Sequence, residues 1–269
     1  MRLGILGYPV GHSLSPAMHR AALAARGIAG SYEPLATPPE RLAERIEEVR
    51  RGFRGVNVTV PLKERVLSLL DAVEPAARAI GAVNTVVNEG GRLIGHNTDA
   101  PGFLKSLEEA GVEGSRALVL GAGGAARAVV YALIRAGWDV AVWNRTRARA
   151  ERLVAELGGR LAAPEAAREV DLLVNATSVG LEDPAATPLP AEFFPPRGYI
   201  VDLVYKPLKT RFLREAEERG LVAVNGLGML LWQGAIAFEL WSGEAAPISA
   251  MRSALDAAIT GGDSRPSRE

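Results

Sequence analysis

The sequence predicts an α/β fold of two domains, an N-terminal mostly parallel α/β domain and a Rossmann-type domain. Short apolar stretches alternate with amphipathic ones along the chain, which is the βαβ pattern of a parallel sheet covered by helices. A glycine-rich turn, GAGGAA, lies between one apolar stretch and a helix near the middle of the chain. The length of 269 residues suits two ordinary domains.

The first domain is expected to begin with strands over RLGILG, SYEPLA and GVNVTV. Helices from about Ser15 and through PPERLAERIEEVRRG separate these strands. In GVNVTV the valines alternate with Asn57 and Thr59, which predicts a strand with one apolar face that ends at Pro61. A helix through VLSLLDAV is expected next, and then a hairpin over VNTVVNEGGRLIGHNTD with two adjacent glycines in its turn.

The second domain is expected after a connecting helix through PGFLKSLEEAGVEG. Its predicted strands lie in RALVLG, WDVAVWNRT, DLLVNATS, YIVDLVY and LVAVNG, and the last helices run through LLWQGAIAFELWSG and PISAMRSALDAAI. We predict a substrate domain of residues 1–101 plus 237–269 and an NADP domain of residues 102–236, with the active site in the cleft between them. The polar tail GGDSRPSRE is expected to fray.

The composition argues against several classes of function. The chain has no cysteine and only three scattered histidines, so we expect no disulfide, no thiolate nucleophile and no metal site. The 31 basic residues balance 31 acidic ones, which disfavours nucleic acid as a partner. No apolar run is long enough for a membrane span and the N-terminus has no secretory pattern, so we expect a cytoplasmic protein.

The glycine-rich turn indicates a dinucleotide site. Gly121 allows a tight turn, Gly123 lets the backbone approach a pyrophosphate, and Ala126 allows close packing of the helix on the strand. The N-terminus of that helix offers free N–H groups and a positive dipole end to phosphate.

The residues after the next strand predict NADP as the cofactor. NAD sites usually end this strand with a carboxylate, whereas VAVW is followed by Asn144 and Arg145. Arg145 offers a planar guanidinium to a ribose 2′-phosphate, with Arg147 or Arg149 in support. The alternative, a solvated start of the next helix, suits Arg149 better than Arg145.

The acid/base group for a hydride transfer is expected from the first domain. Zinc-dependent alcohol dehydrogenases are excluded by the missing cysteines, and we do not expect the Tyr-x-x-x-Lys pair of short-chain dehydrogenases in the second domain. Lys63, after the strand NVTV, and Asp99, in GHNTD, are the candidates. The alternative for Lys63 is a solvated first turn of a helix.

Taken together, the motifs resemble the shikimate dehydrogenase family over nearly the whole chain. The matching stretches are GYPVGHSLSPAMHRAAL, NVTVPLKE, GAVNTVV, GHNTDAPGF, GAGGAARAV, NRT, NATSVG, DLVYKPLKT and NGLGMLLWQGAIAFELW. The resemblance implies reversible NADPH-dependent reduction of 3-dehydroshikimate, a small molecule, to shikimate in aromatic amino-acid biosynthesis. It also suggests a homodimer.

The resemblance further implies roles for individual residues. It makes Lys63 and Asp99 the catalytic residues. The residues that it implies for substrate binding are Ser13 and Ser15 at the carboxylate, Thr59, Asn84 and Asp99 at the ring hydroxyls, and Tyr205 and Gln233 on the other side. Those implied for the cofactor are Gly121, Ala122, Gly123, Gly124, Ala125, Asn144, Arg145, Thr146, Arg147 and Arg149, with Thr177, Leu203, Gly226 and Met229 on the nicotinamide side.

Some alternatives remain open. Ser15 could cap a helix, and Met229 could be a core residue. Among the histidines, His12 and His96 are expected to support the site, whereas His19 is expected to pack in the interior or lie at the surface. The rival functions are a quinate or dual quinate/shikimate dehydrogenase, a non-catalytic NADP-binding module, and a methylene-tetrahydrofolate dehydrogenase.

Overall fold

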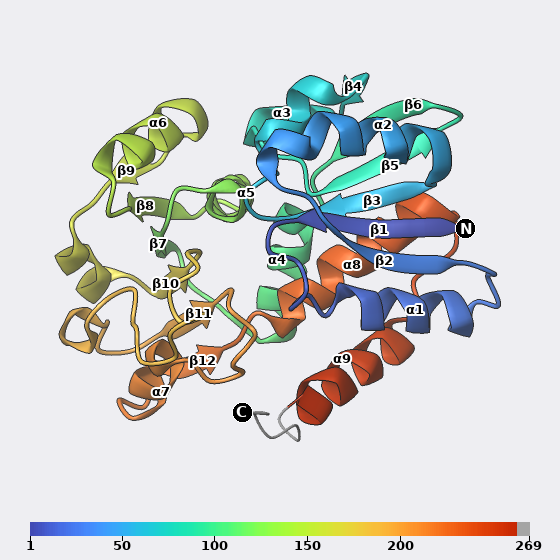
Figure 1. The fold of residues 1–269 in the computed structure, drawn as a ribbon. Coiled ribbons are helices and arrows are strands. Elements are labelled where there is room, and N and C mark those ends of the chain that lie inside the picture. The colour runs from blue at the N-terminus through green and yellow to red at the C-terminus, as the bar shows by residue number, and fades with distance from the viewer. Residues whose placement is uncertain (263–269) are drawn as a thin grey trace. The chain divides into compact units, whose positions relative to one another are not determined.

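The computed structural model describes residues 1–262 and divides into two compact units (Figure 1). Unit 1 comprises Met1–Thr98 and the chain from Leu230 onward, and unit 2 comprises Asp99–Met229. The predicted α/β class with two domains is confirmed. The predicted boundaries, 101/102 and 236/237, lie a few residues further along the chain than these divisions. Residues 263–269 of the tail that was expected to fray lie outside the described part.

Unit 1 is built on a sheet of six strands in the order β2-β1-β3-β5-β6-β4. These strands are β1 (Arg2–Gly7), β2 (Ser31–Ala36), β3 (Gly55–Val58), β4 (Ala72–Val73), β5 (Thr85–Glu89) and β6 (Arg92–His96). β1 pairs in parallel with β2 and β3, as does β4 with β6, whereas β5 pairs antiparallel with β3 and β6. The β5–β6 pair is the predicted hairpin, and Gly90 and Gly91 in its turn have φ of +62° and +98°.

Both sides of strand β3 in unit 1 are covered. The helices of this unit are α1 (Ser15–Ala25), α2 (Leu42–Gly52), α3 (Pro75–Ile80), α8 (Leu227–Ser242), which begins in unit 2, and α9 (Ile248–Gly262), with 3₁₀ turns η1 (Pro39–Arg41) and η2 (Arg65–Leu69). Val56 and Val58 belong to an apolar core shared with α2, η2 and α3. Asn57 lies on the other face, as alternation requires, and is also buried. The predicted strand with one apolar face is therefore confirmed, and its polar face is buried as well.

The segment VLSLLDAV does not form the predicted helix. It contains η2 and β4, and α3, which was not predicted, follows. Asp71 ties this segment to strand β6, because its N–H donates to the Leu93 carbonyl at 3.1 Å and its carboxylate accepts from the Leu93 N–H at 2.7 Å. Strand β3 also ends earlier than predicted, at Val58, which leaves Val60 61% exposed.

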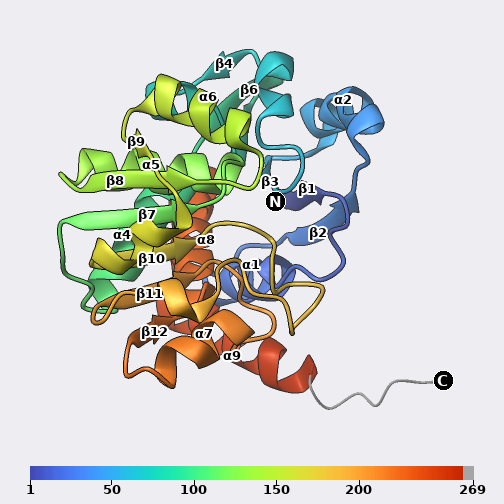
Figure 2. The same cartoon turned by 90° about the vertical axis from the view of Figure 1, so that its left-hand side faces the viewer.

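Unit 2 contains a fully parallel sheet in the order β12-β11-β10-β7-β8-β9, whose strands Figure 2 shows stacked in this sequence. The strands are β7 (Arg116–Leu120), β8 (Asp139–Trp143), β9 (Arg160–Leu161), β10 (Leu172–Asn175), β11 (Tyr199–Asp202) and β12 (Val222–Val224). The helices are α4 (Asp99–Glu109), α5 (Gly124–Arg135), α6 (Arg147–Leu157) and α7 (Arg211–Glu217), with η3 (Pro164–Glu169) and η4 (Ala191–Phe193).

This strand order confirms the Rossmann-type prediction. The chain order reverses between β7 and β10, and ligands of such sheets bind beyond the carboxyl ends of the strands at this point. Within the described residues, no helix is both long and apolar enough to cross a membrane.

Candidate active site

Ser13 and Ser15 lie where the loop after β1 enters helix α1. Ser13 is half-buried and Ser15 is buried, and the Ser13 hydroxyl oxygen accepts from the Ser15 N–H at 3.2 Å. Helix α1 begins at Ser15, whose own side chain caps none of the helix N–H groups, so the alternative of a capping role for Ser15 is wrong. Its hydroxyl is not used for that purpose.

Thr59 and Lys63 belong to the turn that follows strand β3. The Thr59 N–H donates to the Leu6 carbonyl at 2.8 Å, and the Thr59 carbonyl accepts from the Leu62 N–H at 2.8 Å. The Lys63 carbonyl accepts from the Val83 N–H at 2.9 Å. These bonds hold the turn next to Val83, the residue before Asn84. They also place the turn at the same edge of the sheet as the loop after β1. Lys63 is half-buried and lies outside any helix, so the alternative of a helix start is wrong.

Asn84 is fixed by bonds from three sides. Its backbone N–H donates to the His96 carbonyl at 3.1 Å and its carbonyl accepts from the Val58 N–H at 2.8 Å. Its side chain bonds to Thr98 and, at 3.3 Å, donates to the Gln233 amide oxygen. The structure thus brings together Asn84 and Gln233, two residues predicted to bind substrate that are 149 positions apart.

A buried group that was not predicted lies next to Asn84. The Asn57 amide donates to the Asn84 carbonyl and to the Thr85 hydroxyl, both at 3.1 Å, and its oxygen accepts from the Tyr32 hydroxyl at 2.7 Å. The Tyr32 ring stacks on His19 at 4.4 Å between centroids. His19 is fully buried, so of the two expected alternatives the structure supports packing.

Asp99 and Tyr205 belong to unit 2. Asp99 is buried, starts helix α4 and directly follows Thr98. Tyr205 is half-buried in the segment after β11. Tyr205 and Lys209 do have the Tyr-x-x-x-Lys spacing, which we did not expect in this domain. Their segment forms no helix, however, and the Lys209 ammonium pairs with Glu217 at 2.9 Å.

The glycine turn after β7 is open toward a ligand. Gly121 has φ of +122°, and a Cβ there would lie 2.9 Å from the Ala176 carbonyl oxygen, so only glycine fits the turn. A Cβ at Gly123 would meet no atom within 4 Å, and helix α5 starts at Gly124. The N–H groups of this first helical turn, which includes Ala125, are therefore bordered by space that a pyrophosphate can enter.

The segment after β8 lies beside this turn, since the Gly121 N–H donates to the Trp143 carbonyl at 2.8 Å. The Asn144 side chain donates to the Thr146 carbonyl at 2.8 Å and shapes the segment. The Arg147 guanidinium pairs with Glu151 at 2.7 Å. Arg145 and Arg149 are exposed and form no ion pair with any described residue. These two therefore offer the more available guanidinium groups.

The residues expected on the nicotinamide side follow β10, β11 and β12. Thr177 is next to the glycine turn, because a Cβ at Gly121 would lie 3.2 Å from its methyl carbon. A Cβ at Gly226 would lie 2.2 Å from the Leu203 carbonyl oxygen, which requires glycine where these two turns meet. Met229 is buried, which agrees with the alternative of a core residue.

Sequence reasoning missed Asn175 and Asp202, the last residues of β10 and β11. Both are fully buried and hydrogen-bonded to each other at 2.9 Å. The signal that could have found them is a polar residue that closes an otherwise apolar strand, as in LLVN and YIVD.

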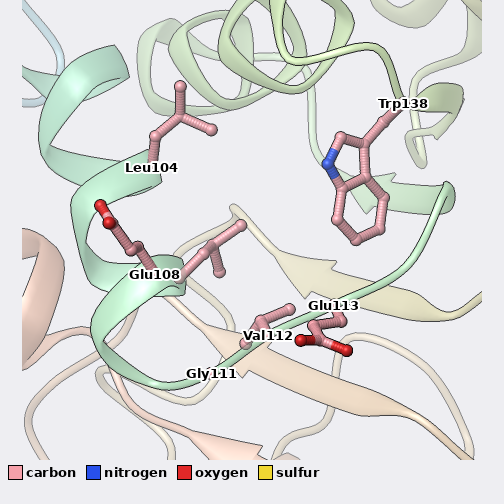
Figure 3. A pocket seen from close by; sticks show the side chains of 7 residues that line it. Leu104, Glu108, Gly111, Val112, Glu113 and Trp138 are labelled. Atoms are coloured by element: carbon pink, nitrogen blue, oxygen red, sulfur yellow. The ribbon is translucent and has the colours of Figure 1, made fainter.

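Other features of the described residues lie apart from these groups. A hollow of about 340 Å³ in unit 2 is lined by Leu104, Leu107, Glu108, Gly111, Val112, Glu113 and Trp138 (Figure 3), and no predicted site residue lines it.

No group of three or more acidic or histidine side chains suited to a metal occurs in the described part. His12 is exposed, and burial lowers the pKa of half-buried His96.

Three family models of known proteins match parts of the chain. Residues 5–86 match the family model of the shikimate dehydrogenase substrate binding domain, residues 104–181 match that of shikimate / quinate 5-dehydrogenase, and residues 226–255 match that of the shikimate 5′-dehydrogenase C-terminal domain.

Whole-chain relatives are also similar. A shikimate dehydrogenase (NADP⁺) of Thermus thermophilus is 59% identical over 96% of this chain and 99% of its own length. That of Symbiobacterium thermophilum is 50% identical over 96% and 95%. A crystal structure of shikimate 5-dehydrogenase from Thermus thermophilus with NADP(H) and shikimate superposes with a TM-score of 0.93 at 59% identity, covering 96% of this chain and 99% of that one.

Proposed function

Because the chain belongs to the shikimate dehydrogenase family, we propose that it catalyses the reversible reduction of 3-dehydroshikimate to shikimate with NADPH. The main support within the molecule is the pair of backbone hydrogen bonds that join Lys63 to Val83 and Val58, the residue before Thr59, to Asn84, which directly precedes strand β5. These bonds bring an ammonium, a hydroxyl and an amide to one sheet edge. A ketone that must be held by hydroxyl groups and protonated needs these three kinds of group.

The substrate is held by convergent polar side chains. Ser13 and Ser15 donate hydroxyl hydrogens to the carboxylate, and Thr59, Asn84 and Gln233 bond to the ring hydroxyls. Asp99 and Tyr205 complete this set. Each polar group left unmatched in a closed site costs roughly 1–3 kcal/mol, so the set distinguishes this ring from less hydroxylated ones.

Lys63 carries the proton. In the reduction, the carbonyl carbon accepts a hydride and the carbonyl oxygen takes a proton from the Lys63 ammonium, which gives the alcohol. In the oxidation, neutral Lys63 accepts the hydroxyl proton as the hydride leaves. Asp99 accepts a hydrogen bond from a ring hydroxyl of the substrate.

NADP(H) fits the residues of unit 2, and when bound it supplies or receives the hydride. The turn from Gly121 to Ala125, Ala122 included, holds the pyrophosphate with backbone N–H groups at the start of α5. Arg145 binds the 2′-phosphate with help from Arg149, and Thr146 and Arg147 border the same group. Thr177, Leu203 and Gly226 lie against the nicotinamide.

Quinate is the second candidate substrate, because the matching family model covers shikimate and quinate enzymes. Quinate carries an additional hydroxyl at the carbon that bears the carboxylate. The domain division at 101/102 and 236/237, a homodimeric state and a cytoplasmic location remain part of this proposal. So does the absence of nucleic acid as a partner, which rests on the balanced charge.

The proposal is tested by following NADPH absorbance with the purified protein, using shikimate or quinate with NADP or NAD. We expect the fastest turnover with shikimate and NADP. A faster quinate reaction would favour the second candidate, and no turnover with either substrate would favour a non-catalytic module.

A Ser15→Ala variant tests the substrate assignment separately. It should raise the KM for shikimate and leave the dissociation constant of NADP unchanged, whereas Ser68→Ala, at an exposed position of η2, should change neither. An equal weakening of both ligands by Ser15→Ala would make Ser15 a structural residue.

A further inference from the structure

Asp202 is a buried carboxylate with no part in the chemistry proposed above. It ends strand β11 and is fully shielded from solvent. One oxygen accepts from the Thr210 hydroxyl at 2.6 Å, and the other accepts from the Val204 N–H at 3.0 Å and the Asn175 amide at 2.9 Å. Neutral donors therefore hold a group whose burial as an anion is costly. A buried carboxylate of this kind is therefore expected to serve a structural or functional role.

The first connection runs from Asp202 through Asn175 to Thr177. An ionised carboxylate only accepts hydrogen bonds, so the Asn175 nitrogen must face it and the Asn175 oxygen must face the other way. That oxygen accepts from the Thr177 N–H at 3.0 Å and from the Thr177 hydroxyl at 2.7 Å. Asp202 therefore sets the orientation of the amide that shapes the turn after β10.

The second connection fixes the segment from Leu203 to Thr210. The Val204 N–H holds its start on Asp202, and the Thr210 hydroxyl holds its end while also accepting from the Leu213 N–H at 3.3 Å as the cap of helix α7. The Leu203 N–H donates to the Asn175 carbonyl at 2.9 Å. Both ends of the segment that carries Leu203 and Tyr205 are thus attached to one carboxylate.

The two connected turns lie at the carboxyl ends of β10 and β11, beside the strand-order reversal where ligands of this fold bind. We infer that Asp202 is a positioning residue that holds Thr177 and the segment after β11 in the arrangement against which the nicotinamide is oriented. This inference rests on the proposed function only for the identity of the ligand. The phosphate-binding groups at Gly123 and Arg145 lie on other turns, so nicotinamide placement should respond to Asp202 separately from adenosine binding.

Asp171 provides a matched control in the same sheet. It precedes β10 at the opposite edge, where its carboxylate accepts from the Ser115 and Arg116 N–H groups, each at 3.0 Å. Asp171 thus joins the start of β10 to β7 through backbone N–H bonds, whereas Asp202 joins β11 to β10 through the Asn175 side chain. Asp171→Asn therefore reports what the loss of a strand-joining carboxylate does when no predicted site residue is attached to it.

The test compares Asp202→Ala, Asp202→Asn, Thr210→Val and Asp171→Asn with wild type. Fluorescence of bound NADPH reports nicotinamide immobilisation, and the dissociation constant of adenosine 2′,5′-bisphosphate, a fragment without nicotinamide, reports the phosphate end. We expect Asp202→Ala to lose at least about half of the fluorescence enhancement and about tenfold in kcat, with fragment affinity within about twofold of wild type.

The conservative variant Asp202→Asn should keep more of the fluorescence enhancement and of kcat than Asp202→Ala, since the oxygen of the introduced amide can still accept from Val204 and Asn175. Thr210→Val should show a smaller loss of enhancement, and Asp171→Asn should show none. If Asp202→Ala does not fold, Asp202→Asn and Thr210→Val test the inference by the same two measurements, the fluorescence of bound NADPH and the affinity for the fragment.

Wild-type fluorescence and kcat in the Asp202 and Thr210 variants would overturn the inference, as would an equal loss in Asp171→Asn. If the wild type binds NADPH but does not oxidise shikimate when NADP⁺ is supplied, the proposed function fails. The fluorescence comparison then still supports or overturns the role of Asp202.

Discussion

Asn84 and Thr98 are joined by two hydrogen bonds that run in opposite directions. The Thr98 N–H donates to the Asn84 side-chain oxygen at 2.6 Å, and the Asn84 side-chain nitrogen donates to the Thr98 hydroxyl at 2.9 Å. Because a backbone N–H can only donate, the amide oxygen must face it. The Asn84 nitrogen is therefore turned toward Thr98 and Gln233, and this fixes which end of the amide a substrate hydroxyl meets.

Replacing Thr98 by Val should weaken shikimate binding. The change keeps the shape of the side chain but removes the nearer of the two acceptors of the Asn84 nitrogen, which costs roughly 1 kcal/mol, or about fivefold in KM. The control is Thr37→Val, which removes a buried hydroxyl that donates to the Leu35 carbonyl at 2.8 Å in the same unit. It should lower stability without changing KM. Equal KM values for both variants would contradict the role of the pair.

Lys63→Met should lower turnover by about 10²–10⁴-fold, the usual effect of losing a positioned acid or base, and leave shikimate affinity nearly unchanged. Steady-state kinetics and shikimate titration measure the two effects. Lys209→Met, which removes an exposed lysine paired with Glu217, is the control. Turnover within about threefold of wild type in folded Lys63→Met would mean that the proton comes from another group.

Arg145→Ala should raise the KM for NADP more than the KM for NAD. A charge-assisted phosphate contact contributes roughly 1.5–3 kcal/mol, so the NADP value should rise about tenfold or more. Arg160→Ala, which removes another exposed arginine of unit 2 that pairs with Asp139 at 3.6 Å, serves as the control. A similar increase for both cofactors would contradict a 2′-phosphate contact.

The regular elements could be predicted because local patterns encode them. The spans RLGILG and SYEPLA match β1 and β2 residue for residue, since RLGILG is mostly apolar and both spans are bounded by turns. The helix predicted over VLSLLDAV was wrong. The apolar spacing of this segment suits a helix, but the hydrogen bonds between Asp71 and Leu93 are tertiary and leave no local pattern in the sequence.

The candidate site shows the same division between local and tertiary information. Lys63, Asp99 and the glycine turn occur in short motifs, so they could be proposed from sequence. The roles of Asn57, Thr98 and Asp202 depend on partners from distant segments, such as the bond between Asp202 and Asn175, 27 positions away. A buried polar residue becomes interpretable only when its partners are known.

His19 should make the protein sensitive to acid. Burial lowers its pKa to about 3, against a smaller opposing effect of Asn57, and neither ring nitrogen has a hydrogen-bond partner among the described residues. Since the unfolded value is about 6.5, the stability contribution of neutral His19 is present above pH 6.5 and is lost as the pH falls toward 3.

The loss between pH 7.5 and 5 should be about 2 kcal/mol, at about 1.36 kcal/mol per pH unit below 6.5. Urea unfolding of His19→Leu at the two pH values should lack this loss, whereas His12→Gln, at an exposed position, should retain the wild-type dependence. An unchanged dependence in His19→Leu would show that another group causes it.

Asp202 should make the protein less stable as the pH rises, which is opposite to the effect of His19. Burial raises its pKa to about 6, although bonds from Thr210, the Val204 N–H and Asn175 favour the anion. The folded value thus exceeds the ordinary value of 3.8. The stability contribution of Asp202 is therefore fully present below pH 3.8 and is lost as the pH rises through 6.

Asp202→Asn should consequently gain stability relative to wild type by about 2 kcal/mol between pH 4.5 and 7.5, measured by urea unfolding at both values. Asp171→Asn should show no such gain over this range, because bonds from the Ser115 and Arg116 N–H groups lower the pKa of Asp171 below 3.8 and its contribution is lost only as the pH falls below that value. The two variants thus differ in the pH range over which their stability departs from that of wild type. Parallel pH dependences for the two would contradict the assignment of the buried, destabilised carboxylate to Asp202.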